Sequence, residues 1–280
     1  MAPSAPPLPC RGLQWSGRTV CGPVRPNNED AFVGLRFDAH EVQYLGAIGE
    51  GLSGEMDFAF AVSDGMGGAK AGEYASRIAV EKLIALLPRS YRKSPAISNE
   101  EHAAVLEQLF AQTHESLQHL GRSYAECRGM EATLSLCWFT PSVMYFGHVG
   151  DSRIYHLSQR SGSFQQITQD DTYVGWLFRN GKISEREART HPRRNLLQKA
   201  LGGGNQFVSP QVGSVAYEPG DQFLLCTDGL VDGFYDEQLG EFLRSSACST
   251  LGASSASLIV NDSLARSGRD NTTALVVRAI

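Results

Sequence analysis

The sequence predicts an α+β fold built on antiparallel sheets, and two observations carry this prediction. Predicted strands follow one another in adjacent runs, and predicted helices come in pairs. A doubly wound fold would instead alternate single strands with single helices. No linker or shift in charge divides the 280 residues, so we expect one domain over residues 12–280. Residues 1–11 are rich in proline and are expected to form a disordered lead.

The first predicted elements are two short strands and a loop. Residues 15–20 and 30–37 have the composition of strands and stand on either side of a turn at residues 25–28, where proline is followed by two asparagines. Residues 46–54 contain four glycines. Glycine at this density favours a flexible loop, which is therefore our expectation for this segment.

A buried strand and a helix pair are expected next. The apolar run at 58–63 ends at Asp64-Gly65, so we predict a buried strand that passes straight into a turn. Residues 71–87 and 99–120 each place their apolar side chains on one helical stripe. Between these helices, residues 88–95 are polar and contain two prolines, and we expect a loop.

The second half of the chain returns to strands. Apolar runs separated by turn residues predict strands at 132–139, 143–149, 152–157 and 164–167. A basic, helix-prone stretch then spans residues 171–200. The remaining expected elements are strands at 211–217 and 223–227, helices at 236–245 and 253–267, and a final strand at 273–279.

Composition argues against two classes of function. Apolar residues make up 42% and charged residues 20% of the chain, with a net charge of −5, whereas a nucleic-acid binder is usually basic. No apolar run approaches the roughly 18 residues that a membrane helix needs. The six cysteines form no CxxC pair, and the N-terminus lacks the pattern of a secretion signal. We therefore expect a cytoplasmic protein with unpaired cysteines and with no nucleic-acid or membrane partner.

Acidic residues recur beside the ends of the predicted strands. One Asp-Gly pair is usually only a turn, but five acidic motifs in such positions predict a shared rim. Carboxylates gathered at one rim repel one another and raise each other's pKa values, and a multivalent cation removes this repulsion. The motifs are Asn28-Glu29-Asp30, Asp64-Gly65, Gly150-Asp151, Thr227-Asp228-Gly229 and Asp270-Asn271.

The ligand chemistry of these motifs favours hard cations. All donors are oxygens, which suits Mg²⁺ or Mn²⁺ better than zinc or copper. Gly65 leaves room for a backbone carbonyl to approach a metal. Two such ions about 3.5–4 Å apart bridge a water and lower its pKa, which yields a hydroxide for attack on an electrophile. Arg25 lies four residues before Glu29, and its planar guanidinium is suited to holding a phosphate.

In this order, the motifs resemble those of the metal-dependent serine/threonine protein phosphatases of type 2C, and most closely the bacterial members. The resemblance runs over about residues 17–277. It rests on Arg25-x-x-x-Glu29-Asp30, Asp64-Gly65-Met66-Gly67-Gly68, Val149-Gly150-Asp151-Ser152-Arg153, Ile167-Thr168-Gln169-Asp170-Asp171, Thr227-Asp228-Gly229 and Asp270-Asn271-x-Thr273. It implies an α-β-β-α sandwich, in which two packed antiparallel sheets are flanked by helix pairs. It also implies hydrolysis of phosphoserine and phosphothreonine in proteins by a metal-bridged hydroxide.

The resemblance also assigns roles to single residues. Asp64 would bridge two Mn²⁺ or Mg²⁺ ions, and Gly65 would ligate through its carbonyl. Asp228 and Asp270 would bind the first ion and Glu29 the second. In addition, Asp30 would support the metal site from behind, Arg25 would hold the phosphate, and Asp151 with Asp228 would form a possible third metal site. Residues 174–201 are similar to the flap of bacterial members, and we use this name for them below.

Two positions depart from the family pattern. Animal members carry a histidine, proposed as the acid for the leaving group, where this chain has Met66. The usual Gly-Thr-Thr before the central strands is here Glu131-Ala132-Thr133. The first departure argues against protonation of the leaving group by a side chain, and we expect the second to affect local packing more than chemistry.

Several alternatives stay open from the sequence. The chain could be a catalytically weak module that binds phosphoproteins, while a metal nuclease is disfavoured by the net charge. His148 and Cys226 are expected to be structural and buried. The basic flap residues form either a solvated face or a surface that steers substrate. The expected partners are phosphorylated proteins and a cognate serine/threonine kinase, and the protein is expected to act as a monomer.

Overall fold

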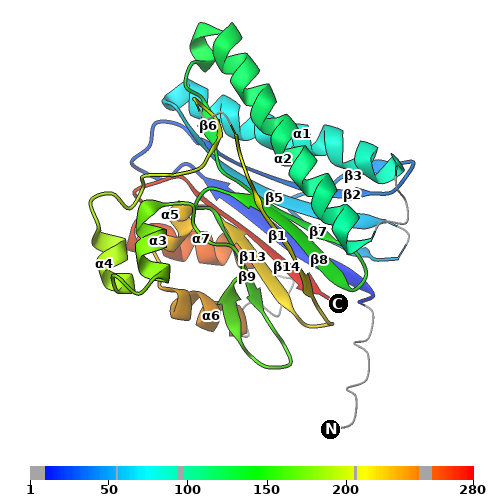
Figure 1. Ribbon diagram of the computed structural model, residues 1–280. Helices are drawn as coiled ribbons and strands as arrows, with labels where there is room; N and C mark the ends of the chain where they lie inside the picture. Colours follow the sequence, from blue (N-terminus) through cyan, green and yellow to red (C-terminus); the bar gives the residue numbers. More distant parts are fainter. Residues whose placement is uncertain (1–9, 55, 94–97, 205–206, 246–253) are drawn as a thin grey trace.

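The computed structural model describes residues 10–54, 56–93, 98–204, 207–245 and 254–280. It contains two antiparallel sheets that pack face to face (Figure 1). The strand order in the first sheet is β10 (Phe164–Gln166), β9 (Arg153–Leu157), β13 (Gln222–Cys226), β14 (Thr272–Ala279), β1 (Gly12–Val20) and β4 (Ile48–Leu52).

The second sheet is built around β5, which contains an unbroken apolar run at residues 58–62. Its order is β11 (Leu201–Gly202), β6 (Glu131–Ala132), β5 (Asp57–Met66), β7 (Leu134–Phe139), β8 (Val143–Val149) and β12 (Gln211–Ala216). A branch adds β2 (Asp30–Phe37), which pairs with β5, and β3 (Val42–Tyr44), which pairs with β2.

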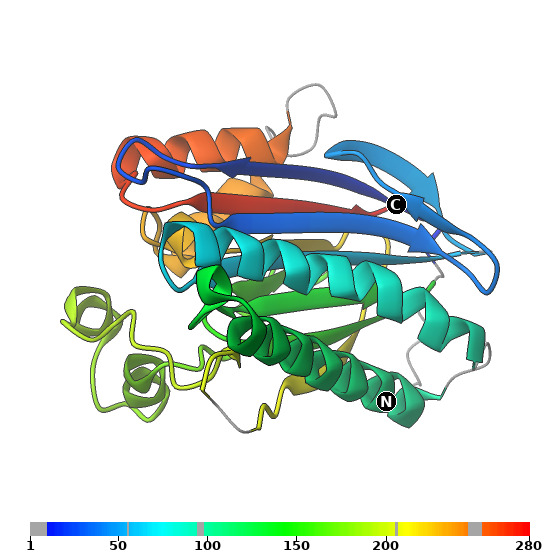
Figure 2. The ribbon, with the colours of Figure 1, turned by 90° about the horizontal axis from the view of Figure 1, so that it is seen from above.

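Helices cover the outer faces of both sheets (Figures 1 and 2). The long helices α1 (Ala69–Lys93) and α2 (Asn99–Ser123) lie on the second sheet, and the 3₁₀ turn η1 (Ala125–Cys127) follows them. The first sheet is covered by α5 (Asp228–Val231), α6 (Asp236–Arg244) and α7 (Ser255–Arg266). Two short helices, α3 (Tyr173–Arg179) and α4 (Glu185–Thr190), project beyond one side of the sandwich. The arrangement is the α-β-β-α sandwich that the resemblance implied.

Three hydrophobic layers hold this architecture together. Between the sheets, Phe139 packs edge-on against Phe60 and Phe223. The layer under α1 and α2 includes Leu83 and Phe110, which are fully buried, and a third layer lies under α5 to α7. Because the outer helices and both sheets share these layers, the strand ends that carry the acidic motifs are held on a rigid frame.

Residues 46–54 are not the flexible loop that their glycines suggested. They contain β4, which pairs with β1 and forms an edge of the first sheet. A Cβ on Gly49 would lie 2.5 Å from the ring of Trp15, and one on Gly51 would lie 2.9 Å from the ring of Phe58. The glycines therefore make room for two core aromatic rings and do not mark a flexible segment.

Two other boundaries differ from prediction. Helix α1 continues through Pro88 to Lys93, where a loop was expected, and Leu83 and Leu87 anchor this part of the helix in the core. Packing of the apolar stripe outweighs the hydrogen bond that proline removes. Strand β5 also runs past the expected turn, because Gly65 and Met66 pair with β6.

The ends of the predicted segments are also informative. The predicted lead included Cys10, which is buried and donates its backbone N–H to the carbonyl of Pro141; the lead's first nine residues lie outside the described part. Ala253, the expected first residue of the last helix, is likewise not described, and α7 begins at Ser255. The five cysteines of the described residues are free thiols. No helix within the described ranges is long and apolar enough to cross a membrane.

Candidate active site

Antiparallel pairing brings the acidic motifs to one end of the sandwich. Strand β2 begins where β5 ends, and Asp30 lies directly opposite Asp64 in their register. Asp228 follows β13, and Asp270 precedes its partner β14. A cavity of about 380 Å³ opens there. Its lining includes Arg25, Glu29, Asp64, Gly65, Asp151, Asp228 and Asp270.

Asp30 differs from the other predicted site residues because it lies behind the cavity. It is 7% exposed, and its Oδ2 accepts hydrogen bonds from the hydroxyls of Thr227 at 2.7 Å and Thr273 at 2.6 Å. Its Oδ1 is buried without a hydrogen-bond partner. Asp30 thus links the start of β2 in one sheet to the end of β13 and the start of β14 in the other.

Asn271 organises the opposite wall, and its role was missed by the sequence analysis. Its side-chain oxygen accepts the backbone N–H of Glu29 at 2.8 Å. Its amide donates to the carbonyls of Cys21 at 2.8 Å and Asn27 at 3.0 Å. Asn271 is therefore the clamp that fixes the loop carrying Arg25 and Glu29. The only signal in the sequence was an asparagine directly after a candidate ligand at the start of a strand.

Arg25 stands at the rim of the cavity beside Asp270. Its Nη2 lies 2.6 Å from the Asp270 Oδ2, and the two side chains are 44% and 21% exposed. This hydrogen bond, with the nearby Asp270 and Glu29 charges, raises the pKa of Arg25 above its ordinary value. The guanidinium is bonded on one edge to a carboxylate and lines a cavity that holds four more candidate carboxylate ligands.

Gly65 and Gly72 form a close backbone approach next to Glu29. A Cβ on Gly65 would lie 1.9 Å from the carbonyl oxygen of Gly72. A Cβ on Gly72 would lie 2.7 Å from the carbonyl oxygen of Gly65 and 2.9 Å from the carboxylate of Glu29. The Gly65 carbonyl and the Glu29 carboxylate therefore flank one small space, which only glycine at both positions leaves open.

Thr133, which interrupts the predicted strand 132–139, positions Asp64. The backbone N–H of Asp64 donates to the Thr133 hydroxyl at 2.9 Å, and the N–H of Thr133 donates to the carbonyl of Asp64 at 2.8 Å. The same hydroxyl lies 2.7 Å from the hydroxyl of Ser152, the neighbour of Asp151. The unusual Glu131-Ala132-Thr133 motif thus keeps the one side chain that connects two acidic motifs.

The carboxylates are electrostatically frustrated. Burial, followed by the charges of neighbouring aspartates, raises the pKa values of Asp64 and Asp228 well above the ordinary value. Burial is also the main cause that raises the pKa of Asp30 to about 7, against hydrogen bonds that lower it. The pKa of Asp151 is raised to about 7 by burial and Asp170, although the charge of Arg153 opposes the shift.

The donor set suits hard divalent cations. One carboxylate oxygen of Asp228 is buried with no hydrogen-bond partner, and a buried anionic oxygen without a partner is costly. All donors around the cavity are oxygens, as Mg²⁺ and Mn²⁺ prefer. No three acidic, histidine or cysteine side chains among the described residues already converge as a metal cluster. The carboxylates surround an open cavity, and a cation would have to draw them inward.

Met66 and His148 also bear on the chemistry. Met66 lines the cavity and has no proton to donate. His148 is buried, and its ring nitrogens lie 2.8 Å from the Ser135 hydroxyl and 3.0 Å from the carbonyl of Gly150. Burial lowers its pKa and favours the neutral ring. Its position supports the structural role expected of it, and Cys226 is likewise fully buried.

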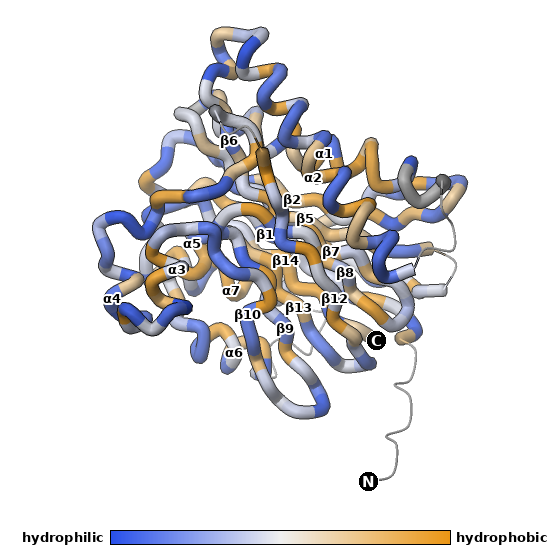
Figure 3. Tube along the Cα trace, in the orientation of Figure 1, coloured by the Kyte–Doolittle hydropathy of each residue, from blue (hydrophilic) through white to orange (hydrophobic). Residues whose placement is uncertain are grey.

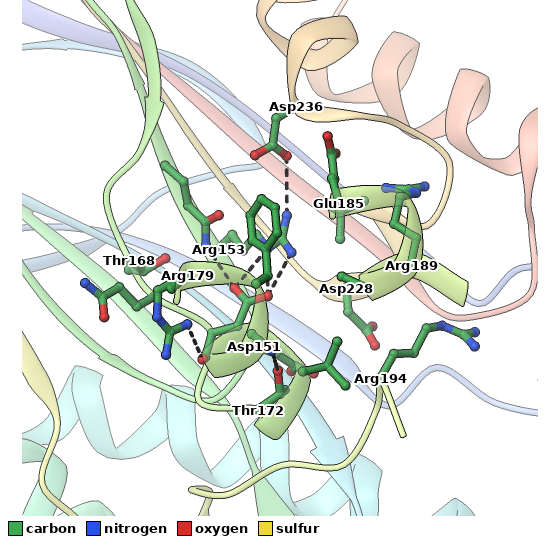
Figure 4. A pocket seen from close by; sticks show the side chains of 18 of the residues that line it. Asp151, Arg153, Thr168, Thr172, Arg179, Glu185, Arg189, Arg194, Asp228 and Asp236 are labelled. Atoms are coloured by element: carbon green, nitrogen blue, oxygen red, sulfur yellow. Dashed lines mark hydrogen bonds and ion pairs between the residues drawn. The ribbon is translucent and has the colours of Figure 1, made fainter. Parts of the chain in front are cut away.

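A second, smaller pocket of about 160 Å³ lies under the flap (Figure 4). It shares Asp151, Asn195 and Asp228 with the carboxylate cavity, so the two spaces adjoin. The isolated β-bridge between Thr172 and Leu197 joins the segment just before the flap to the last part of the flap. The flap therefore forms one wall of the region in which a bound substrate would extend away from the carboxylates.

Arg153 anchors this wall (Figure 4). Its guanidinium binds Asp170 through Nε at 2.9 Å and Nη2 at 2.7 Å, and it also donates to the hydroxyl of Tyr155. Asp236 accepts a hydrogen bond from Tyr155 at 2.9 Å. The carbonyl of Asp170 in turn accepts from Arg179 on α3 at 2.8 Å. Neither Arg153 nor Asp170 was assigned a role from the sequence.

Asp171 connects the flap to the third candidate metal site. Its backbone N–H donates to the carbonyl of Gly150 at 2.7 Å, and its carboxylate accepts the N–H of Gly150 at 3.2 Å. On the flap side, its carbonyl accepts from Gln198 at 2.7 Å, and its carboxylate lies 3.3 Å from the ammonium of Lys199. The turn that carries Asp151 is thus bonded to the residue that precedes the flap.

Comparison with known proteins agrees with this arrangement. The family model described as protein phosphatase 2C matches residues 50–266. The chain is 31% identical to the serine/threonine protein phosphatase PstP of Mycobacterium tuberculosis over 272 residues. This alignment covers 96% of this chain and 45% of PstP. It is 32% identical over 217 residues to the serine/threonine phosphatase stp of Listeria innocua, covering 77% of this chain and 82% of the relative.

A solved structure gives the same result in three dimensions. The catalytic domain of PstP in complex with two manganese ions superposes with a TM-score of 0.74 at 30% identity, over 96% of this chain and 99% of that chain. The present chain spans about half the length of full PstP and nearly the whole of its catalytic domain. By its sequence, fold and carboxylate cavity, the chain belongs to the protein phosphatase 2C family.

Proposed function

We propose that this protein hydrolyses phosphoserine and phosphothreonine in proteins and depends on Mn²⁺ or Mg²⁺. The observation that carries the proposal is the carboxylate cavity beside Arg25, in which every predicted ligand position is present and lines one space. Membership of the phosphatase family and the two manganese ions named for PstP support the same chemistry. A binding module would have no need of several mutually repelling carboxylates.

The residues divide into metal-holding and substrate-holding groups. Asp64 would be shared by two ions, with Asp228 and Asp270 holding one and Glu29 with the Gly65 carbonyl holding the other. Bound cations would supply an activated water and a positive field for the phosphoryl oxygens. A third ion between Asp151 and Asp228 is part of the proposal, because both side chains line the cavity.

Arg25 would bind the phosphate of the substrate. Its guanidinium offers a planar set of donors, which match two oxygens of a phosphate in a bidentate contact. Its bond to Asp270 holds it at the rim and couples the phosphate position to that of the carboxylate. Because Met66 cannot donate a proton, we propose that the leaving serine or threonine oxygen is protonated by water.

The cellular setting is part of the proposal as well. Phosphoserine and phosphothreonine are products of protein kinases, so a cognate serine/threonine kinase is the proposed counterpart in signalling. Free cysteines in the described part of the chain suit the reducing cytoplasm. We propose that the protein acts there as a monomer, because one chain supplies every proposed metal ligand and the proposed phosphate-binding Arg25.

A phosphopeptide assay tests the proposal. Phosphate release from a phosphothreonine peptide should require Mn²⁺ or Mg²⁺, stop with a chelator, and fall about a thousandfold or more in Asp228→Ala. Asp262→Ala, which removes an exposed aspartate paired with Arg266 on α7, is the matched control and should keep the activity. No metal-dependent release by the wild-type protein would overturn the proposal and favour a phosphoprotein-binding module.

A further inference from the structure

The flap carries a charge opposite to that of the rest of the chain. Residues 174–201 contain seven Lys or Arg and two Glu, a net charge of +5. The whole chain carries −5, so the residues outside the flap carry −10 together. A local excess of this size beside an acidic cavity sets a strong field that favours anionic groups approaching along the flap.

Most of the basic residues of the flap hold it in place. Arg179 donates to the carbonyl of Asp170, and Arg189 donates to the carbonyls of Asp232 and Phe234. The ring of Tyr235 lies under the Arg189 guanidinium at 4.4 Å. Two more flap bases are paired with aspartates, Arg194 with Asp232 and Lys199 with Asp171. These four bases therefore have structural partners.

Three basic residues of the flap remain, and we call them the flap bases: Lys182, Arg186 and Arg193. All three are exposed, and within the described residues none of their charged side-chain groups has a hydrogen-bond or ion-pair partner. They lie in or next to α4, on the outer part of the flap, where Figure 3 shows mainly hydrophilic residues. Their charges are consequently available to a ligand.

The acids of the flap do not cancel this charge. Glu187 is the N3 residue of α4, and its carboxylate accepts both the backbone N–H and the hydroxyl of Ser184 at 2.8 Å in a capping box. Glu185 is partly buried and lines the pocket under the flap. Each glutamate thus faces the helix start or the pocket, while the flap bases are exposed to solvent.

We infer that the flap bases form a docking surface for acidic segments, rich in Asp and Glu, that flank the phosphorylated residue of a substrate protein. The inference rests on the proposed phosphatase function and names the class of substrate that the site prefers. The pocket under the flap adjoins the carboxylate cavity, so a chain with its phosphate in the cavity can continue along the flap. Complementary charge would raise the association rate and orient the flanking residues.

Three phosphothreonine peptides of equal length test the inference. One carries Glu residues before the phosphothreonine, one carries them after it, and one carries Ser and Ala in their place. The wild-type protein with Mn²⁺ should show a kcat/KM about tenfold higher for at least one acidic peptide than for the neutral one. Added salt should reduce this ratio, because exposed charges are screened.

The ratio of kcat/KM for acidic and neutral peptides should fall to about one in the triple variant Lys182→Ala, Arg186→Ala, Arg193→Ala. The matched control is Arg11→Ala, Arg89→Ala, Arg160→Ala, which removes three exposed bases outside the flap and makes the same change in net charge. A circular dichroism melt verifies that both triple variants are folded. An unchanged ratio in the flap variant, or an equal loss in the control, would overturn the inference.

A binding measurement separates this inference from the proposed function. Fluorescence anisotropy with the unphosphorylated acidic peptide should show binding by the wild-type protein that the flap variant loses and the control variant keeps. Absence of turnover with every phosphopeptide would count against the phosphatase function. Equal binding of acidic and neutral peptides by an active enzyme would count against the docking surface alone.

Discussion

Arg25 and Asp270 are separated by 245 positions in the sequence, yet their side chains are joined by a hydrogen bond of 2.6 Å at the rim of the carboxylate cavity. The pair couples the group proposed to hold the phosphate to a group proposed to hold a metal ion. Asn271 next in sequence clamps the loop that carries Arg25. The relative position of the two functions is therefore set by one short stretch at the start of β14.

Replacement of Arg25 should affect substrate handling and leave folding intact. Arg25 is 44% exposed and lies outside the hydrophobic core, so Arg25→Ala should keep the melting temperature within a few degrees. It should lower kcat/KM for a phosphothreonine peptide by about 10²-fold, because a charge-assisted bidentate contact is lost. Arg25→Lys should recover only part of this loss. A large decrease in the melting temperature of Arg25→Ala would instead show that Arg25 has a structural role.

Repulsion among the carboxylates of the cavity should lower the free energy of unfolding of the metal-free protein. Asp228 holds a buried oxygen without a partner, and neighbouring aspartates raise its pKa. Asp228→Asn removes a charge from this cluster, so it should raise the melting temperature in chelator while it abolishes phosphatase activity. Differential scanning fluorimetry with and without Mn²⁺ measures both effects. A lower melting temperature of Asp228→Asn in chelator would contradict this account.

The same carboxylates predict how stability depends on pH in chelator. Asp30 and Asp151 have pKa values raised from 3.8 to about 7. Between about pH 4 and pH 7 the folded protein therefore keeps protons that the unfolded chain has released, and stability falls as pH rises. The slope is at most about 1.4 kcal/mol per pH unit for each such group.

Urea unfolding across this pH range measures the slope. Asp30→Asn should flatten it, whereas Asp262→Asn on the exposed face of α7 should leave it unchanged. Since metal ligands must lose their protons, Mn²⁺ binding should release protons in this range and weaken as pH falls. A stability that rises steadily from about pH 4 to pH 7 in chelator would be incompatible with the raised pKa values.

The Arg153 network should contribute to stability more than an exposed ion pair. Arg153 and Asp170 are 22% and 14% exposed and share several hydrogen bonds. Arg153→Met leaves the partly buried Asp170 without its ion-pair partner, and we expect a loss of about 3 kcal/mol in the free energy of unfolding. Arg266→Met, which breaks an exposed pair on α7, should cost less than about 1 kcal/mol. If urea unfolding gives equal losses of unfolding free energy for the two variants, the Arg153 network stabilises the protein no more than an exposed ion pair does.

The close approach of Gly65 to Gly72 predicts a steric requirement. A Cβ on Gly65 would lie 1.9 Å from a backbone oxygen that cannot move aside easily. Gly65→Ala should therefore destabilise the protein by about 3 kcal/mol and remove metal-dependent activity. Gly204→Ala, where a Cβ would meet nothing within 4 Å, is the control and should be close to neutral. Wild-type stability and activity in Gly65→Ala would refute the proposed cradle.

The sequence predicted the features that depend on the spacing of apolar residues and on the order of the acidic motifs along the chain. Apolar alternation located most of the strands, and the order of the acidic motifs indicated their assembly at one rim. Prediction was wrong where tertiary packing overrides local composition. Gly49 and Gly51 lie in a strand because the rings of Trp15 and Phe58 need their space, and Pro88 stays in a helix because Leu87 is fully buried.

The supporting residues of the site could not be predicted for a different reason. Thr133, Asn271 and Asp171 act through a few hydrogen bonds to backbone atoms that are distant in sequence. Nothing in composition or spacing distinguishes such a residue from any other polar residue near a turn. The division of the basic residues of the flap into anchored and available ones likewise depends on partners between α5 and α6 and just before α3, which only the folded chain brings together.

Calorimetric titration of the metal-free protein with Mn²⁺ tests the central claim most directly. If Glu29, Asp64, Gly65, Asp228 and Asp270 form a two-metal centre, the wild-type protein should bind at least two ions per chain with release of protons. Asp64→Ala should bind fewer, because it removes the ligand that both ions share, and Asp262→Ala should match the wild type. No saturable Mn²⁺ binding by the wild-type protein, or unchanged stoichiometry in Asp64→Ala, would contradict the account.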